Sequence, residues 1–169
     1  LKTAVIEARS RGIIVCCSAG NRDNDHTRWP AAWDDVVTAA VVRPDFVKTG
    51  NSSYGLNVDF VAPSGAEYQA GFKHSEMMAA VKWSPPQPYW PDWTPWHDAT
   101  TPSGSVHTYK QLNGDTSGGA AQLSGAFVLL KAHYPNHSRD ELIAEMVRGA
   151  VDVDPYQPPE HPEYLGKLG

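Results

Sequence analysis

The chain of 169 residues carries a formal net charge of −5 at pH 7. This acidic balance gives no basic footprint of the kind that nucleic-acid binding requires, and no apolar run approaches the roughly 20 residues of a membrane-spanning helix. A chain of this length can bury one hydrophobic core, so we treat residues 1–169 as one globular unit.

The chain opens in residues 1–11 with the pattern of an amphipathic helix, and no capping residue stands before it. A helix pattern without its N-terminal cap is typical of the middle of a longer chain. We therefore expect these residues to be preceded by further sequence.

Residues 12–17 form a short β-branched run beside glycine, which predicts a buried strand. The strand leads into Ser-Ala-Gly-Asn and so places the Asn21 amide just beyond a strand end. Acyl transfer needs such a donor at the oxygen of the tetrahedral intermediate. Within the strand Cys16 and Cys17 point to opposite faces, which favours two core thiols over a vicinal disulfide.

The acidic cluster Asp23-Asn24-Asp25 offers hard oxygen ligands of the kind that calcium prefers. The alternative interpretation, which we prefer, is a solvated loop. No cofactor is expected to be required, and calcium remains an option only as a structural ion.

Residues 66–112 make the most individual region, and residues 83–96 within it are rich in tryptophan and proline. Prolines at this density exclude a helix or a central strand there and predict an irregular loop. Its functional interpretation is a lid or subsite wall, or a binding surface for carbohydrate or peptide. The interpretation that we favour is that the Trp rings pack the loop onto the domain.

The segment 113–125 places Ser117 at the start of an almost wholly apolar run that predicts a helix buried on nearly every side. The unpaired N–H groups and positive dipole end of such a helix favour developing negative charge beside the Ser117 hydroxyl. The run keeps Gly118, Gly119 and Gly125 despite their poor helix propensity, which indicates close backbone approach. The alternative is a core helix with Ser117 as its N-cap.

Downstream, Ser138 and Glu141 form a capping box that predicts the start of a further helix. Its apolar residues share one face; they are Leu142, Ile143, Met146, Val147 and Ala150. Residues 155–169 are expected to be a surface tail.

Several of these segments together resemble, in order, the second half of the catalytic domain of a subtilisin-like serine protease. They are residues 12–21, ending like the family's A-A-G-N; Trp29-Pro30-Ala31 and the strand pattern 36–42; residues 53–63, similar to S-x-G-x-x-V-D-x-x-A-P; and Thr116-Ser117 with the helix after it. The ending 164–169 also resembles the G-K-L-G that follows in many relatives.

The resemblance implies an α/β fold of three layers, helix, mainly parallel sheet and helix, present here as an incomplete domain with 66–112 as an insertion. It also implies a serine endopeptidase that works through an acyl-enzyme on a peptide or protein substrate, and a secreted or extracytoplasmic location. The triad His and Asp lie upstream in this family. We therefore expect a separate N-terminal half to supply them, since no segment here resembles their motifs.

For the site, the resemblance implies that Ser117 is the nucleophile and Asn21 the oxyanion-hole donor. It implies a substrate-binding role for Ser18, Ala19 and Gly20, and it places Arg28 at the base of the specificity pocket. No catalytic metal is implied. The seven histidines are interpreted as surface or loop residues; they are His26, His74, His97, His107, His133, His137 and His161.

Two positions depart from the family pattern. Asp115 stands where relatives have glycine before Thr-Ser, and Ala121 stands where they have proline. A carboxylate beside the nucleophile can crowd the oxyanion site or oppose the charge that develops there. The rival hypothesis is therefore a catalytically inactive scaffold or binding module derived from a subtilase.

Overall fold

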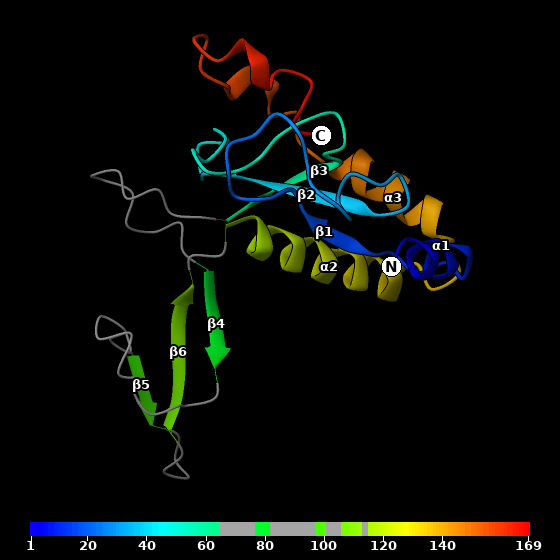
Figure 1. Ribbon diagram of the computed structural model, residues 1–169. Coiled ribbons are helices and arrows are strands. Elements are labelled where there is room, and N and C mark those ends of the chain that lie inside the picture. Colours follow the sequence, from blue (N-terminus) through cyan, green and yellow to red (C-terminus); the bar gives the residue numbers. More distant parts are fainter. Residues whose placement is uncertain (65–76, 82–96, 101–105, 113–114) are drawn as a thin grey trace.

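The computed structural model describes residues 1–64, 77–81, 97–100, 106–112 and 115–169 (Figure 1). The helices and short 3₁₀ turns are α1 Lys2–Ser10, α2 Asp115–His133, α3 Arg139–Gly149, η1 Asp154–Tyr156 and η2 Pro162–Tyr164. The strands are β1 Cys16–Ser18, β2 Val37–Val42, β3 Phe60–Pro63, β4 Met77–Val81, β5 His97–Thr100 and β6 Val106–Leu112.

The core is a parallel sheet in the order β1-β2-β3. Cys16 lies opposite Val37, and Ala39 lies opposite Phe60, so β2 is paired along both edges. Every residue of β2 is buried, as expected for a central parallel strand that is covered on both faces.

A separate apolar cluster forms on each face of this sheet. On one face α2 and α3 pack against the strands, with Phe60 and Phe127 in an edge contact of 6.3 Å between ring centroids. On the other face the C-terminal segment supplies Tyr164 and Leu168, which are 8% and 0% exposed. The predicted three-layer α/β architecture with a parallel sheet is therefore confirmed (Figure 1).

The residues at the start of α2 lie directly on the sheet. A Cβ added at Gly119 would lie 2.6 Å from Val41 Cγ1 and 3.2 Å from the Ala40 carbonyl oxygen. Only glycine allows this approach, so the prediction of close backbone contact is confirmed at Gly119. It is wrong at Gly125, where a Cβ would meet nothing within 4 Å in the part of the chain that the structure describes.

The outer face of α2 corrects a second expectation. Val128 and Leu129 are 68% and 73% exposed, so α2 is not buried on nearly every side by the residues that the structure describes. The helix also begins at Asp115, which places Ser117 inside its first turn and not at the N-cap. The apolar residues of α2 favour burial of its outer face, but the sequence of the helix does not show which segment covers that face.

The first strand is shorter and less buried than predicted. β1 begins only at Cys16, and Ile13 before it is 52% exposed. Among the described strands β1 pairs with β2 alone, which leaves its residues half-buried. Cys16 and Cys17 are free thiols, and burial raises the pKa of both.

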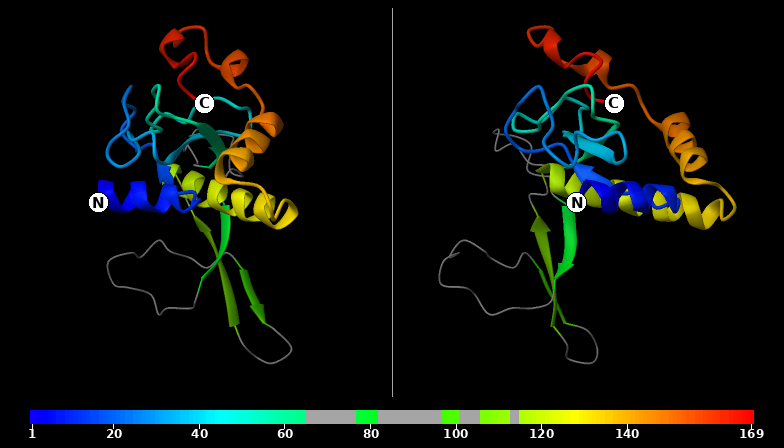
Figure 2. Two further views of the ribbon diagram at one scale, coloured as in Figure 1. Left: turned by 90° about the vertical axis from the view of Figure 1, so that its right-hand side faces the viewer. Right: turned by 45° about the vertical axis from the view of Figure 1, so that its right-hand side comes forward.

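The region 66–112 contains a second, antiparallel sheet in the order β4-β6-β5, drawn apart from the parallel sheet in both views of Figure 2. Sequence reasoning predicted no strand here, although the run 106–112 holds the Val, Thr and Tyr that strands favour. The Trp/Pro-rich residues 83–96 lie outside the described residues, so the predictions made for this loop are not tested here.

Both predicted helices outside α2 are present. The Ser138 and Glu141 side chains form the full capping box of α3, and Leu142 is buried against α2, whereas Val147 is 59% exposed. Ala150 lies just beyond the end of α3 and is also exposed. Within the described ranges, no helix is long and apolar enough to cross a membrane.

Candidate active site

Segments far apart in the sequence meet at the N-terminus of α2. Because α2 packs across β1 and β2, its first turn lies beside the turn that follows β1. The Gly20 N–H donates to Thr116 Oγ1 at 3.2 Å and so fixes this contact. Thr116 itself is only 1% exposed, although the side chains around it lie at the surface.

Thr116 fixes the orientation of the Asn21 amide. Asn21 Oδ1 accepts from the Thr116 backbone N–H at 3.2 Å and from Thr116 Oγ1, while Asn21 Nδ2 donates to Asp115 Oδ2 at 3.4 Å. A backbone N–H can only donate and a carboxylate only accept, so this orientation alone satisfies both neighbours. Sequence reasoning gave Thr116 no role, although its place beside Ser117 was visible.

Ser117 is the third residue of α2 and is exposed. Among the described residues its hydroxyl has no hydrogen-bond partner, and its N–H belongs to the first turn, where helix donors lack intrahelical acceptors. The structure thus brings Asn21 to the residue next to Ser117. Both groups face solvent at the positive end of a helix of 19 residues.

Asp115 lies between two side-chain amides. Its Oδ2 accepts from Asn21, and its Oδ1 accepts from Asn51 Nδ2 at 2.8 Å. Asn51 is held in turn by Thr49, whose hydroxyl donates to Asn51 Oδ1 at 3.2 Å. Asn51 is a further residue that the sequence did not single out, because nothing in its own segment points to residues so far along the chain.

The remaining residues expected to bind substrate follow β1. Ser18 is half-buried and Ala19 is 1% exposed, with its N–H donating to the Ala39 carbonyl at 2.9 Å. Gly20 has a φ of +110°, and a Cβ there would lie 3.3 Å from Ser53 Oγ. Glycine is therefore required where the chain turns from β1 toward Asn21.

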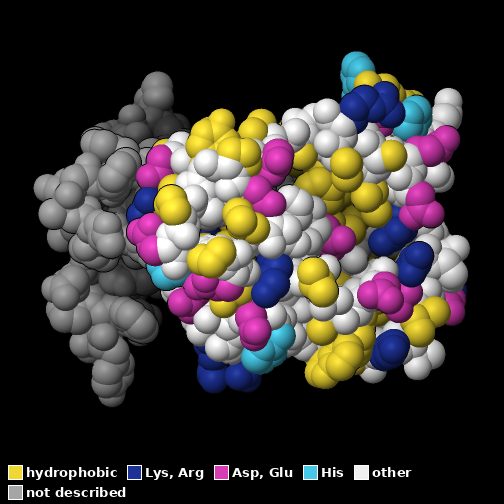
Figure 3. All heavy atoms as spheres, turned by 90° about the horizontal axis from the view of Figure 1, so that it is seen from above, with side chains coloured by type: hydrophobic (Ala, Val, Ile, Leu, Met, Phe, Trp, Pro, Cys, Tyr) yellow, Lys and Arg dark blue, Asp and Glu magenta, His cyan; other side chains and the backbone are white. Residues whose placement is uncertain are grey.

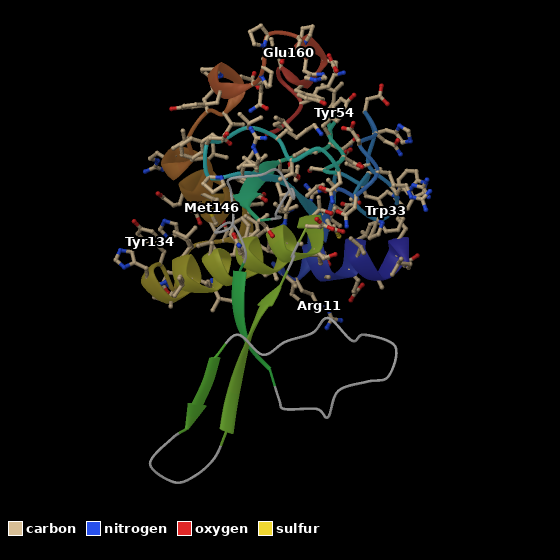
Figure 4. The ribbon with its side chains drawn as sticks, turned by 90° about the vertical axis from the view of Figure 1, so that its left-hand side faces the viewer. Arg11, Trp33, Tyr54, Tyr134, Met146 and Glu160 are labelled. Atoms are coloured by element: carbon tan, nitrogen blue, oxygen red, sulfur yellow. The ribbon has the colours of Figure 1, made fainter. Side chains whose placement is uncertain are left out.

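Arg28 lies on an exposed loop just before the cis peptide bond between Trp29 and Pro30. Trp29 is 68% exposed and stacks at an angle on Trp33, with 5.4 Å between ring centroids. Figure 4 shows Trp33 beside α1, where the Lys2 ammonium lies 5.9 Å from its ring. In the part of the chain that is described, Arg28 makes no ion pair.

The acidic cluster Asp23-Asn24-Asp25 forms an ion pair with a buried lysine. The Lys48 side chain is 1% exposed, and its Nζ donates to Asp23 Oδ1 at 2.7 Å and to the Thr49 and Ser52 carbonyls at 2.9 Å. The neighbouring Asp25 accepts from His26, which lowers the pKa of that carboxyl. No group of three or more His, Cys, Asp or Glu that could hold a metal occurs among the described residues.

Three of the histidines whose side chains the structure describes lie near acidic partners, and His133 packs against the Tyr134 ring. His26 contacts Asp25, His137 lies 3.8 Å from Glu145, and His161 contacts Glu163 at 2.9 Å. Acidic and basic side chains are interspersed over the face seen in Figure 3. None of the four histidines whose side chains are described, His26, His133, His137 and His161, makes a hydrogen bond to the Ser117 hydroxyl.

The sequence of this chain is similar to a known protein family and to a known enzyme. The family model described as the subtilase family, Peptidase S8, matches residues 1–166. Subtilisin DY of Bacillus licheniformis is 26% identical over 146 residues, which cover 84% of this chain and 41% of the relative.

Two solved structures share the fold. A protease of Pseudoalteromonas arctica superposes with a TM-score of 0.69 at 23% identity, over 90% of this chain and 40% of the other. A lanthipeptide protease gives a TM-score of 0.65 at 19% identity, over 89% of this chain and 47% of the other. The chain thus spans less than half the length of each of these relatives.

Proposed function

Because this chain belongs to the subtilase family, we propose that it is the nucleophile-bearing part of a serine endopeptidase. The observation that carries the proposal is the contact between Asn21 and Thr116, which brings a side-chain amide to the residue beside Ser117 at a helix N-terminus. A hydroxyl, a side-chain amide and the N–H groups of a helix start supply the nucleophile and the oxyanion donors that acyl transfer requires, whereas the general base has to come from elsewhere.

In the proposed reaction the Ser117 hydroxyl attacks the scissile carbonyl while its proton passes to a histidine base. The carbonyl oxygen becomes an oxyanion that accepts from Asn21 Nδ2 and from the Ser117 N–H. The base then protonates the leaving amine, which departs and leaves an acyl-enzyme, and water releases the acyl group by the same route in reverse.

The base and its orienting carboxylate are assigned to a preceding N-terminal half. Support comes from the relatives, of which this chain covers only 40% to 47%, and from the fact that none of His26, His133, His137 and His161 bonds the Ser117 hydroxyl. The backbone of Ser18, Ala19 and Gly20 would lie along the substrate, because this segment leads from β1 directly to Asn21.

A catalytically inactive scaffold is the second candidate. It is favoured by one observation, the carboxylate of Asp115 bonded to the proposed oxyanion donor. The two candidates differ in a measurable property, since only a protease forms a covalent bond between Ser117 and an active-site-directed electrophile.

The test is to label the full-length protein with a fluorophosphonate probe. Wild-type protein should be labelled at Ser117, and Ser117→Ala should abolish the label. Ser124→Ala is the matched control, because Ser124 lies on the same helix with its hydroxyl bonded to the Ala120 carbonyl, and it should label normally. Labelling that survives Ser117→Ala, or no labelling of the wild type, would refute the proposal.

A further inference from the structure

We propose that Asp115 is a built-in restraint on oxyanion stabilisation, which occupies the Asn21 amide until the reacting carbonyl displaces it. The inference rests on the proposed function and deepens it. It assigns to Asp115 the role of a positioning residue that lowers the rate of acylation at Ser117 in the resting protein.

Asp115 accepts a hydrogen bond from the nitrogen that is proposed to stabilise the oxyanion. The Asn21 amide offers two N–H groups, and Asp115 Oδ2 accepts from this nitrogen at 3.4 Å. Asn21 Oδ1 is already held by both Thr116 donors, so the amide cannot turn over without losing them. One of the two N–H groups is therefore directed at the Asp115 carboxylate, and a reacting carbonyl oxygen that approaches this N–H has to compete with that carboxylate for it.

The charge of Asp115 is not balanced by an ion pair among the described residues. The ion pairs among the described residues use other carboxylates, and none includes Asp115. The Lys48 ammonium is committed to Asp23 and to two backbone carbonyls. Asp115 thus presents an unneutralised carboxylate at the point where a tetrahedral intermediate would develop negative charge, and like charges at short range oppose each other.

The backbone of Asp115 has an unfavourable conformation. Asp115 has a φ of +35°, in the left-handed region that glycine adopts without penalty and that other residues rarely occupy. Strain at a candidate site persists only where the surrounding contacts fix it. Here Asn51 fixes it through a bond of 2.8 Å, and Asn51 is fixed by Thr49 and by the Asp23 N–H, which donates to the Asn51 carbonyl at 3.0 Å.

The test compares second-order rate constants for fluorophosphonate labelling in the full-length protein. Asp115→Asn removes the charge and keeps the size, whereas Asp115→Gly removes the side chain and relieves the positive φ. Asp140→Asn is the matched control, because Asp140 is also an acidic residue in the first turn of a helix, and its side chain is 81% exposed.

We expect Asp115→Asn to label roughly 10-fold faster than wild type and Asp115→Gly about 10- to 100-fold faster, since one oxyanion donor is worth about 10²- to 10³-fold. Asp140→Asn should label at the wild-type rate. For peptide hydrolysis the gain should appear in kcat, with KM little changed, because the restraint acts on charge that develops during the reaction.

The outcomes separate this inference from the proposed function. If Ser117→Ala abolishes labelling but neither Asp115 variant accelerates it, the restraint is refuted and the protease assignment stands. If no variant is labelled at all, both are refuted. Thermal unfolding of each variant checks that Asp115→Asn and Asp115→Gly are folded, and Asp115→Gly should be at least as stable as wild type.

Discussion

At the scale of single residues, the arrangement around Asn21 shows how a surface side chain acquires a fixed direction. Its carbonyl oxygen accepts two bonds from Thr116, and Thr116 is held by the Gly20 N–H. The amide nitrogen is directed away from Thr116 and donates to Asp115. A group that is fixed before the reaction stabilises charge without reorganisation during it.

Asn21→Ala should lower kcat of the full-length enzyme by about 10²- to 10³-fold and leave KM nearly unchanged, because the amide would bond the oxyanion more strongly than the ground-state carbonyl. Steady-state kinetics on a peptide substrate provides the measurement. A control is Asn57→Ala, an exposed asparagine whose amide reaches only the Ala32 carbonyl at 3.5 Å. Equal losses in kcat and in substrate affinity would contradict the role of Asn21.

Arg28 is predicted to disfavour Lys and Arg in the substrate residue before the cleaved bond. Its side chain makes no described ion pair, so its charge is available to a substrate, and like charges in a partly desolvated pocket repel. Arg28→Gly should shift the preference measured with a peptide library away from Glu and toward Lys. Arg22→Gly, at another exposed arginine, serves as the control. An unchanged ratio of Glu to Lys cleavage would show that Arg28 does not line the pocket.

The two cysteines should react slowly with alkylating reagents near neutral pH. Burial raises the pKa of the Cys16 and Cys17 thiols, so less thiolate is present than in an unfolded chain. Alkylation by iodoacetamide should therefore be slower in the folded protein and should accelerate as pH rises toward the raised pKa values. Mass spectrometry at several pH values measures this, with denatured protein as the reference. Fast alkylation at pH 7 would contradict it.

At the scale of elements, the start of α2 lies close to the sheet because residue 119 is glycine. Gly119→Ala should destabilise the protein by about 1 to 3 kcal/mol, because the added methyl group meets Val41 and the Ala40 carbonyl. Gly125→Ala is the matched control on the same helix. It should stabilise by about 0.5 to 1 kcal/mol through helix propensity alone. Denaturant unfolding measures both, and equal effects of the two changes would disprove the close packing at Gly119.

The elements differ in how well the sequence predicts them. β2 and the capped start of α3 depend on local patterns, a β-branched run and a Ser138/Glu141 pair, and both are where the sequence places them. The outer face of α2 could not be predicted, because Val128 and Leu129 are apolar whatever lies over them. The bond between Asn51 and Asp115 joins residues 64 positions apart, and no local pattern encodes such a contact.

At the scale of the whole molecule, Lys48 connects parts that are distant in sequence. Its ammonium binds Asp23 in the loop after β1 and lies 4.5 Å from the ring of Tyr164 in the C-terminal segment. Tyr54, labelled in Figure 4, packs edge-on against Tyr164 at 4.8 Å. One buried cation thus joins the loop that carries Asn21 to the segment that closes the core.

Lys48→Met should lower the free energy of unfolding by about 2 to 4 kcal/mol, since hydrogen bonds to a charged group contribute about 1.5 to 3 kcal/mol each and the methyl group recovers part of the burial. Thermal or denaturant unfolding of the full-length protein measures the loss. Lys131→Met is the matched control, because Lys131 is exposed and, among the described residues, its ammonium bonds the His137 carbonyl alone. A loss no larger than that of the control would rule out the connecting role.

The close contact at Gly119 lies near the end of α2 that carries Ser117 and far from the end that carries Val128 and Leu129. The helix extends about 21 Å from Gly119 to His133 but only about 3 Å from Gly119 to Ser117. A rigid tilt of α2 about Gly119 would therefore move His133 about seven times as far as Ser117. Leu123 and Phe127, which are buried against the sheet and α3, oppose such a tilt, so the position of Ser117 depends little on what lies over the exposed Val128 and Leu129.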